Sequence, residues 1–133
     1  GALTSTVGAE LASAPERPLA VIGDFNVAPE DTDVWDIADF AGSTHVTTAE
    51  REALAAVRAV GLADVMPRAL KGAPFTFWDY RGGNFHKGMG MRIDLVYGNA
   101  PFVSRVSDAW IDREERKGKG ASDHAPVVVD LTP

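Results

Sequence analysis

The apolar positions of this chain repeat with two periods, one typical of helices and one typical of strands. Residues 3–14 carry apolar side chains at every fourth position and end before a proline, which predicts a helix. Residues 47–60 form a second helical face that stops at Gly61, and Thr47 and Glu50 have the spacing of an N-terminal capping box. We expect this second segment to be the one long helix of the domain.

Short segments rich in β-branched and aromatic residues predict strands. Residues 19–22 are a continuous apolar run, typical of a strand covered on both faces, and Gly23 ends it. A polar turn with one irregular helical turn is expected at residues 31–40. The other predicted strands, each flanked by glycine or proline, are residues 75–80, 93–97, 106–111 and 126–131. Together these elements predict an α/β (α+β) fold with a mixed β-sheet.

Length and composition indicate one soluble domain. The 133 residues, 45% of them apolar, suffice for a single hydrophobic core. The sequence has no cysteine, which excludes disulfides and thiolate metal sites and is compatible with the cytoplasm. No apolar run approaches the roughly 20 residues of a membrane span, and the start lacks the pattern of a signal peptide. We expect a cytoplasmic protein with no membrane partner.

The net charge of −6 is divided unevenly along the chain. Residues 1–66 hold 11 acidic and 3 basic residues, whereas residues 67–133 hold 8 acidic and 10 basic residues. A basic region on an acidic protein could meet the phosphates of a nucleic acid, although a solvated surface of loops is the alternative interpretation. The basic residues concerned are Arg68, Lys71, Arg81, Lys87, Arg92, Arg113, Arg116, Lys117 and Lys119.

A first polar cluster follows the strand predicted at residues 19–22. Asp24 and Asn26 are two residues apart and would lie on the same side of an extended backbone. Hydrolysis of a phosphodiester needs an oriented water, a base and usually a divalent metal ion. Asp24 could be the base or a metal ligand, and Asn26 could orient water or phosphate. The alternative is an Asx turn that closes the strand, which is the commoner role for an isolated Asp-Phe-Asn.

Two more polar clusters accompany later strands. His124 could donate a hydrogen bond to a phosphoryl oxygen while Asp94 accepts its other ring proton and fixes the tautomer. Asp123 could bind Mg²⁺ through its carboxylate. The alternatives are a core histidine satisfied by backbone groups and a loop cap. His45 and His86 have no comparable context and are expected on the surface.

In this order, the clusters resemble a known family. Four segments are similar to the C-terminal motifs of the exonuclease III branch of the endonuclease/exonuclease/phosphatase superfamily, and nearly the whole chain keeps their spacing. The Trp-Asp-Tyr-Arg sequence favours this branch over the DNase I, sphingomyelinase and inositol-phosphatase branches. The segments are Gly23-Asp24-Phe25-Asn26, Phe75-Thr76-Phe77-Trp78-Asp79-Tyr80-Arg81, Met91-Arg92-Ile93-Asp94 and Ser122-Asp123-His124-Ala125-Pro126.

The resemblance implies a DNA-repair enzyme that uses Mg²⁺ (or Mn²⁺), cuts double-stranded DNA 5′ to abasic sites and trims it from 3′ ends. By motif position, Asp24 would activate the attacking water and Asn26 would help to place it. Asp94 would pair with His124, which would stabilise the charge on the phosphoryl group. Asp123 would act at the metal or the leaving oxygen. The implied metal ligands are Asp123, Asp24 and Asn26.

The resemblance also implies residues that contact DNA. The family lines a pocket for a flipped-out abasic sugar at the positions of Phe77, Trp78 and Met91, the last of which is Trp in some relatives. A hydrophobic core is the alternative for these side chains, and we expect it to include Trp110 and part of Trp78. The basic residues implied at the DNA are Arg81, Lys87 and Arg92.

Part of the family's pattern is missing from this chain. The family's fold is a four-layer α/β/β/α sandwich of roughly twice this length, in which each half completes a sheet. Its N-terminal half supplies an Asn, a metal-binding Glu and a catalytic Tyr, and this chain has no Trp-Asn-x-Asn or Gln-Glu-x-Lys segment. Residues 1–133 are therefore expected to be the C-terminal half of one domain, with an incomplete site and the N-terminal half as partner. The alternatives are a phosphatase of the same superfamily acting on a small molecule, and a non-catalytic nucleic-acid-binding fragment.

Overall fold

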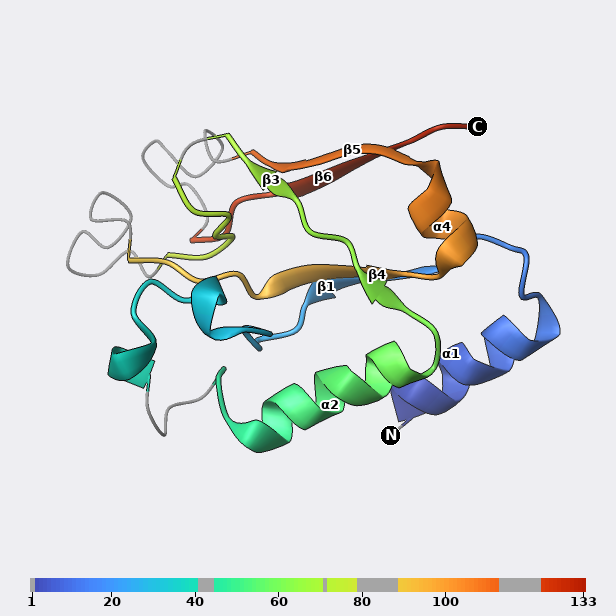
Figure 1. Ribbon diagram of the computed structural model, residues 1–133, viewed down its shortest axis with the longest axis horizontal. Coiled ribbons are helices and arrows are strands. Elements are labelled where there is room, and N and C mark those ends of the chain that lie inside the picture. The colour runs from blue at the N-terminus through green and yellow to red at the C-terminus, as the bar shows by residue number, and fades with distance from the viewer. Residues whose placement is uncertain (1, 41–44, 71, 79–88, 113–122) are drawn as a thin grey trace.

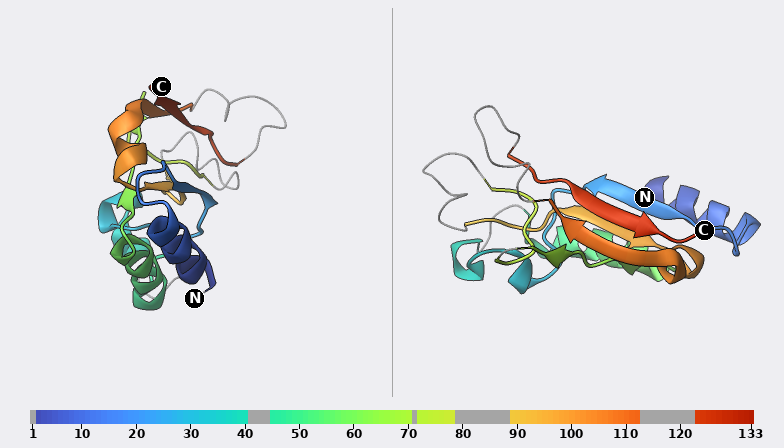
Figure 2. Two further views of the ribbon diagram at one scale, coloured as in Figure 1. Left: turned by 90° about the vertical axis from the view of Figure 1, so that its right-hand side faces the viewer. Right: turned by 90° about the horizontal axis from the view of Figure 1, so that it is seen from above.

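The computed structural model describes residues 2–40, 45–70, 72–78, 89–112 and 123–133, which form a layer of helices and two layers of sheet (Figure 1). Helices α1 (Ala2–Ser13) and α2 (Thr48–Ala59) lie side by side on the outer face of the first sheet. The second sheet covers the opposite face of the first (Figure 2). None of the described helices is long and apolar enough to cross a membrane.

Helices were predicted at both positions, and α2 begins as its sequence indicates. The Glu50 amide donates to the Thr47 hydroxyl at 3.2 Å, and the Thr47 amide donates to the Glu50 carboxylate at 3.3 Å, so the capping box is present. The helix ends at Ala59, and Gly61 follows with a φ of +108°, which few other residues adopt. Leu54 and Val57 of α2 pack with Val7 of α1 against the first sheet. The structure thus has two helices of 12 residues where we expected one long helix.

The first sheet is antiparallel, and β4 is its central strand. β4 (Asp94–Gly98) lies between β1 (Ala20–Asp24) and the short β2 (Ala63–Asp64). Leu95 and Tyr97 of β4 face the helices, whereas Val96 faces the second sheet. Burial on both faces explains the apolar content of β4 and fixes its register against β1.

The first predicted strand, β1, is not covered on both faces as expected, and it lies at an edge of its sheet. Within the described residues, β1 pairs with β4 alone. Val21 packs toward the helices, but the Ile22 side chain is 62% exposed. The sequence run was continuous in apolar residues, yet the second face of β1 lies beyond the reach of the second sheet at Ile22.

The second sheet is mixed. β3 (Arg68–Ala69) runs parallel to β5 (Val106–Ile111), which is antiparallel to β6 (Val127–Leu131). Ala109 and Val129 face the first sheet and join the core between the two layers. On the outer face of this sheet, Trp110 is half-buried and stacks under the Arg68 guanidinium, 5.7 Å from the ring centre. The expectation that Trp110 belongs to the core is therefore wrong.

Three further elements differ from the predictions. Residues 75–78 form no continuous strand and make only isolated bridges through Phe77, while Asp79 and Tyr80 lie outside the described residues. The irregular turn at residues 31–40 is two 3₁₀ helices, Asp31–Asp33 and Ile37–Phe40. Helix α4 (Ala100–Arg105) was not predicted, although Asn99 caps it and a proline follows in its first turn.

Candidate active site

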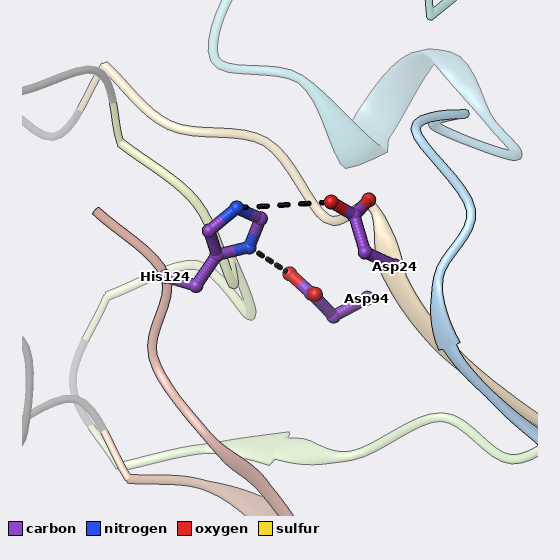
Figure 3. A group of neighbouring side chains, drawn as sticks. All are labelled: Asp24, Asp94 and His124. Carbon is purple, nitrogen blue, oxygen red and sulfur yellow. Dashed lines mark hydrogen bonds and ion pairs between the residues drawn. The ribbon is translucent and has the colours of Figure 1, made fainter. Parts of the chain in front are cut away.

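The two central carboxylates of the site come from paired strands. Asp24 is the last residue of β1, Asp94 is the first residue of β4, and the two are direct partners in the antiparallel register. Antiparallel pairing therefore places both carboxylates at the same end of the first sheet. His124 reaches them from the segment just before β6, in the other sheet (Figure 3).

His124 and Asp94 form a hydrogen-bonded pair. The ring Nδ1 donates to Asp94 Oδ2 at 2.8 Å, and the two side chains are 31% and 20% exposed. This bond requires the proton on Nδ1 and so fixes how the ring presents Nε2. Nε2 lies 3.8 Å from Asp24 Oδ2 and 3.9 Å from Asp123 Oδ1 (Figure 3 shows Asp24). The structure thus brings together Asp24, Asp94, Asp123 and His124, as the sequence predicts.

Asp24 combines the two roles that the sequence left open. Its Oδ1 accepts a hydrogen bond from the Asn26 amide at 2.9 Å, which is the Asx turn. Its Oδ2 points toward His124, so the turn orients the carboxylate instead of replacing its chemistry. Asn26 itself is exposed, with a φ of +54° that asparagine tolerates better than most residues.

His45 contributes to this turn, which the sequence did not indicate. Its Nδ1 bonds the Asn26 carbonyl at 2.5 Å, and its own carbonyl accepts from the Ala28 amide at 2.8 Å. His45 is half-buried and has a φ of +77°. His45 is partly exposed, but it has a structural context that the sequence did not indicate, because its hydrogen bonds hold the backbone on which Asn26 sits. His86 lies outside the described residues.

Phe77 forms a wall of the site next to His124. Its ring meets the imidazole edge-on, with centres 5.0 Å apart and planes at 60°. Phe77 is half-buried, and the isolated bridges that it makes join it to both Met91 and His124. Met91 is 8% exposed and packs beneath it with Ile93 and Val34. Of the three predicted pocket residues, Phe77 is the one with substantial exposed surface.

Trp78 belongs to the core. Its side chain is 2% exposed and clusters with Phe75, Ile111 and Ala125. The indole lies so close to Gly90 that a Cβ on that residue would come within 2.4 Å of the indole nitrogen. Packing of this kind leaves no ring face for a sugar, so the core alternative for Trp78 is correct and its predicted contact with DNA is wrong.

The predicted DNA contact of Arg92 is also wrong. Its side chain is 1% exposed, and the guanidinium bonds Asp33 at 2.9 and 3.3 Å and Asp64 at 3.0 and 2.7 Å. Burial alone would lower the pKa of Arg92, but the hydrogen bonds and charges of Asp64 and Asp33 outweigh it and raise that pKa above its ordinary value. Arg92 is thus a buried cation that joins the turn at residues 31–33 to β2. No local sequence pattern indicates this role, because the partners are 59 and 28 residues away.

The other predicted DNA contacts are largely beyond what the structure describes. Arg81 and Lys87 lie outside the described residues, as do most basic residues of the second half of the chain. Arg68 is described, and it pairs with Asp108 through two hydrogen bonds of 2.9 Å on the outer face of the second sheet.

One group of described residues could hold a metal ion. Ligand atoms of Asp24, Asp94 and His124 all lie within 4.8 Å of one another. Because Asp94 and His124 already bond each other, the carboxylates best suited to Mg²⁺ are those of Asp24 and Asp123, which are 38% and 37% exposed. Mg²⁺ is commonly held by one or two carboxylates together with waters and substrate phosphates, so these residues fit the ion. They would place its charge beside a bound phosphate.

Comparisons with known proteins find relatives that match most of this chain. Exodeoxyribonuclease III of Haemophilus influenzae is 29% identical over 124 residues, which are 86% of this chain and 46% of that protein. A 3′ phosphatase from Neisseria, in a structure with a product DNA hairpin, is 32% identical with a TM-score of 0.87 over 98% of this chain and 50% of that one. An AP endonuclease from Archaeoglobus fulgidus is 27% identical with a TM-score of 0.80, over 97% of this chain and 52% of that one.

These proteins share the α/β fold and its two sheets with this chain, which spans about half of their length. The sequence pattern of the endonuclease/exonuclease/phosphatase family matches residues 5–124, a range that includes Asp24, Asp94, Asp123 and His124. Because this match spans most of the chain, the chain belongs to the endonuclease/exonuclease/phosphatase family.

Proposed function

We propose that this chain is the C-terminal half of a longer protein, here called the parent protein, and that the parent protein hydrolyses phosphodiester bonds of double-stranded DNA. It would act as an abasic-site endonuclease and a 3′-to-5′ exonuclease, with Mg²⁺ or Mn²⁺. The observation that carries the proposal is the oriented Asp94–His124 pair facing the Asp24 carboxylate. The relatives that are DNA nucleases support the choice of substrate.

The spacing between Asp24 and His124 suits a reaction at an oxygen atom. The separation of 3.8 Å between Asp24 Oδ2 and Nε2 exceeds a hydrogen bond, but one oxygen could lie about 2.8 Å from both atoms. Asp24 would take a proton from the attacking water, which Asn26 helps to place. Protonated His124, stabilised by Asp94, would donate a hydrogen bond to a phosphoryl oxygen. The new bond from the water oxygen to phosphorus would replace the bond to the leaving oxygen, which would take a proton from solvent. A metal ion held by Asp24 and Asp123 would neutralise charge on the phosphate.

The N-terminal half of the same fold is the proposed partner of this chain. β1 and β6 are edge strands of the described sheets, and a groove of about 350 Å³ opens between them. It is lined by Ile22, by residues 94–96 and by residues 124–127, and it reaches the His124 side chain. An apolar groove beside free strand edges is a surface that another part of the protein would cover.

A second candidate is removal of 3′ phosphates from DNA ends. It is favoured by the Neisseria relative, which is a 3′ phosphatase and is 32% identical to this chain. The same pair of acid and base would serve, because the bond broken is again between phosphorus and oxygen. This candidate differs from the first in the substrate that fits beside Phe77.

The test uses the purified parent protein and three duplexes, which carry a synthetic abasic site, a recessed 3′ hydroxyl or a 3′ phosphate. We expect cleavage 5′ to the abasic site and trimming of the 3′ end, both lost with a chelator and in Asp24→Asn. Asp130→Asn, an exposed acid on β6, is the matched control and should retain activity. Turnover of the 3′ phosphate alone would favour the second candidate, and inactivity on all three would refute both.

The partner is tested by mixing. The 133-residue chain alone should bind Mg²⁺ weakly and cut none of these duplexes. Addition of a separately produced N-terminal half should restore Mg²⁺-dependent cleavage at the abasic site. Robust cleavage by the chain alone, abolished by Asp24→Asn, would contradict the proposed division of the site.

A further inference from the structure

Thr76 is a buried hydroxyl residue that the proposed chemistry does not use. It is 0% exposed and lies in an aromatic run between Phe75 and Phe77. Its Oγ1 accepts hydrogen bonds from two consecutive amides, those of Ile93 and Asp94, each at 3.1 Å. One hydroxyl oxygen therefore satisfies two amides at the point where β4 begins.

The backbone at Asp94 needs this acceptor. In a regular antiparallel strand, consecutive amides point to opposite sides. Here the Ile93 and Asp94 amides converge on one oxygen, so the chain is turned as it enters β4. This turn sets the direction from which the Asp94 carboxylate leaves the strand toward His124.

Thr76 is also bonded to the segment that carries His124. Its carbonyl accepts from the Ala125 amide at 2.7 Å, and its amide donates to the Met91 carbonyl at 2.9 Å. A single residue thus lies between the two segments whose side chains form the 2.8 Å bond of Nδ1 to Asp94. Removal of the hydroxyl would release the Asp94 side of this bridge and leave the backbone bond on the His124 side in place.

We propose that Thr76 is a positioning residue that holds Asp94 in register with His124, and thereby fixes the Nδ1–H tautomer of that histidine. This inference rests on the proposed function for its effect on catalysis, but not for its effect on the tautomer. The hydroxyl of Thr76 touches no substrate and acts through the Asp94 backbone.

The first test reads the tautomer of His124 without any activity. Long-range ¹H–¹⁵N spectra of the parent protein at about pH 9, above the ordinary histidine pKa of about 6.5, report which ring nitrogen carries the proton. The wild type and Thr76→Ser should show the Nδ1–H form. Thr76→Val, which keeps the shape and loses the acceptor, should shift toward the Nε2–H form. An unchanged tautomer in Thr76→Val would overturn the proposal.

The second test is kinetic and separates positioning from loss of stability. Thr76→Val should lower kcat roughly 10- to 100-fold with little change in KM, since a small displacement of a reacting group has effects of this size. In a His124→Ala background the same change should have little further effect. Thr132→Val, which removes an exposed hydroxyl just beyond the end of β6 that is farther from His124, is the matched control and should keep kcat.

Two outcomes of the kinetic test overturn the proposal. They are equal losses from Thr76→Val with and without His124, and failure of Thr76→Ser to restore kcat. Should Thr76→Val not fold, Thr76→Cys is the second variant, because sulfur is a weak acceptor of similar size. A parent protein inactive on every duplex would remove the kinetic test but leave the tautomer test intact, so failures of the two proposals are distinguishable.

Discussion

Replacement of Arg92 by methionine should strongly destabilise the protein without a specific effect on DNA binding. Arg92 makes four hydrogen bonds to Asp33 and Asp64, and its side chain is 1% exposed. Methionine would fill most of the space but would leave Asp33, which is 2% exposed, as a buried carboxylate without its cation. Loss of one partner from a buried ion pair commonly destabilises by about 3 to 5 kcal/mol. That is a large part of the roughly 5 to 15 kcal/mol by which domains are stable.

The assay is urea unfolding of the parent protein followed by circular dichroism. With an m-value of about 2 kcal/mol/M, the midpoint should fall by about 2 M. The midpoint of Arg92→Lys should lie between those of the wild type and Arg92→Met, because lysine cannot make both two-pronged ion pairs. Arg68→Met is the matched control: Arg68 makes the same two-pronged contact with Asp108, but on an exposed surface, so its midpoint should stay. A midpoint unchanged in Arg92→Met, together with weaker binding to all DNA duplexes, would refute the structural role and restore the phosphate contact.

The remaining predictions concern the site and the start of α2. Asp24→Asn should lower turnover about 10²- to 10⁴-fold while DNA binding persists, and near-normal turnover at saturating Mg²⁺ would contradict its role as base. His124→Ala and Asp94→Ala should be non-additive in kcat, so that the double variant is little worse than His124→Ala; multiplied losses would show that the pair does not act as a unit. Phe77→Ala should reduce the preference for abasic over intact duplex in competition binding, and an unchanged preference would assign the ring to packing alone. The hydrogen bond from the N-cap threonine lowers the pKa of Glu50 below its ordinary 4.5, so the carboxylate stabilises the fold above that pH and this contribution is lost as the pH falls through the lowered value. The difference in melting temperature between Glu50→Gln and wild type should therefore vanish in acid, and a difference that persists at low pH would contradict this reasoning.

The sequence was informative where local chemistry determines structure. The capping box of α2 and the strands at β4, β5 and β6 follow from side chains close together in the chain. It was also informative for the polar cluster, since the order of motifs predicted that Asp24, Asp94 and His124 would meet. The site prediction failed for Arg92 and Trp78, whose environments are set by residues far away in the sequence. A basic or aromatic residue beside a motif looks the same in sequence whether it faces DNA or the core.

Sequence periodicity also does not show which face of a strand is covered by another layer. The run at residues 19–22 is typical of a strand covered on both faces. How far the second sheet extends over this strand depends on the topology of the whole fold. The same limit explains Trp110, whose aromatic character does not reveal which side of β5 is covered. Thr76 was inside a recognised motif, yet its role became visible only when the amides that it satisfies were located.

The unequal settings of β1 and β4 have a consequence for motion within the site. β4 is the central strand of its sheet and its residues 95–98 are buried, so its amides should be among the slowest to exchange with solvent, whereas those of the edge strand β1 should exchange through local fraying. Asp94, whose amide also donates to the buried Thr76 hydroxyl, is therefore held more firmly than Asp24, which ends the edge strand. Breathing of β1 would leave the 2.8 Å bond between Asp94 and His124 intact and vary the 3.8 Å gap between His124 and Asp24. That gap is the adjustable dimension of the site, and whatever pairs with the open edge of β1 would set its width.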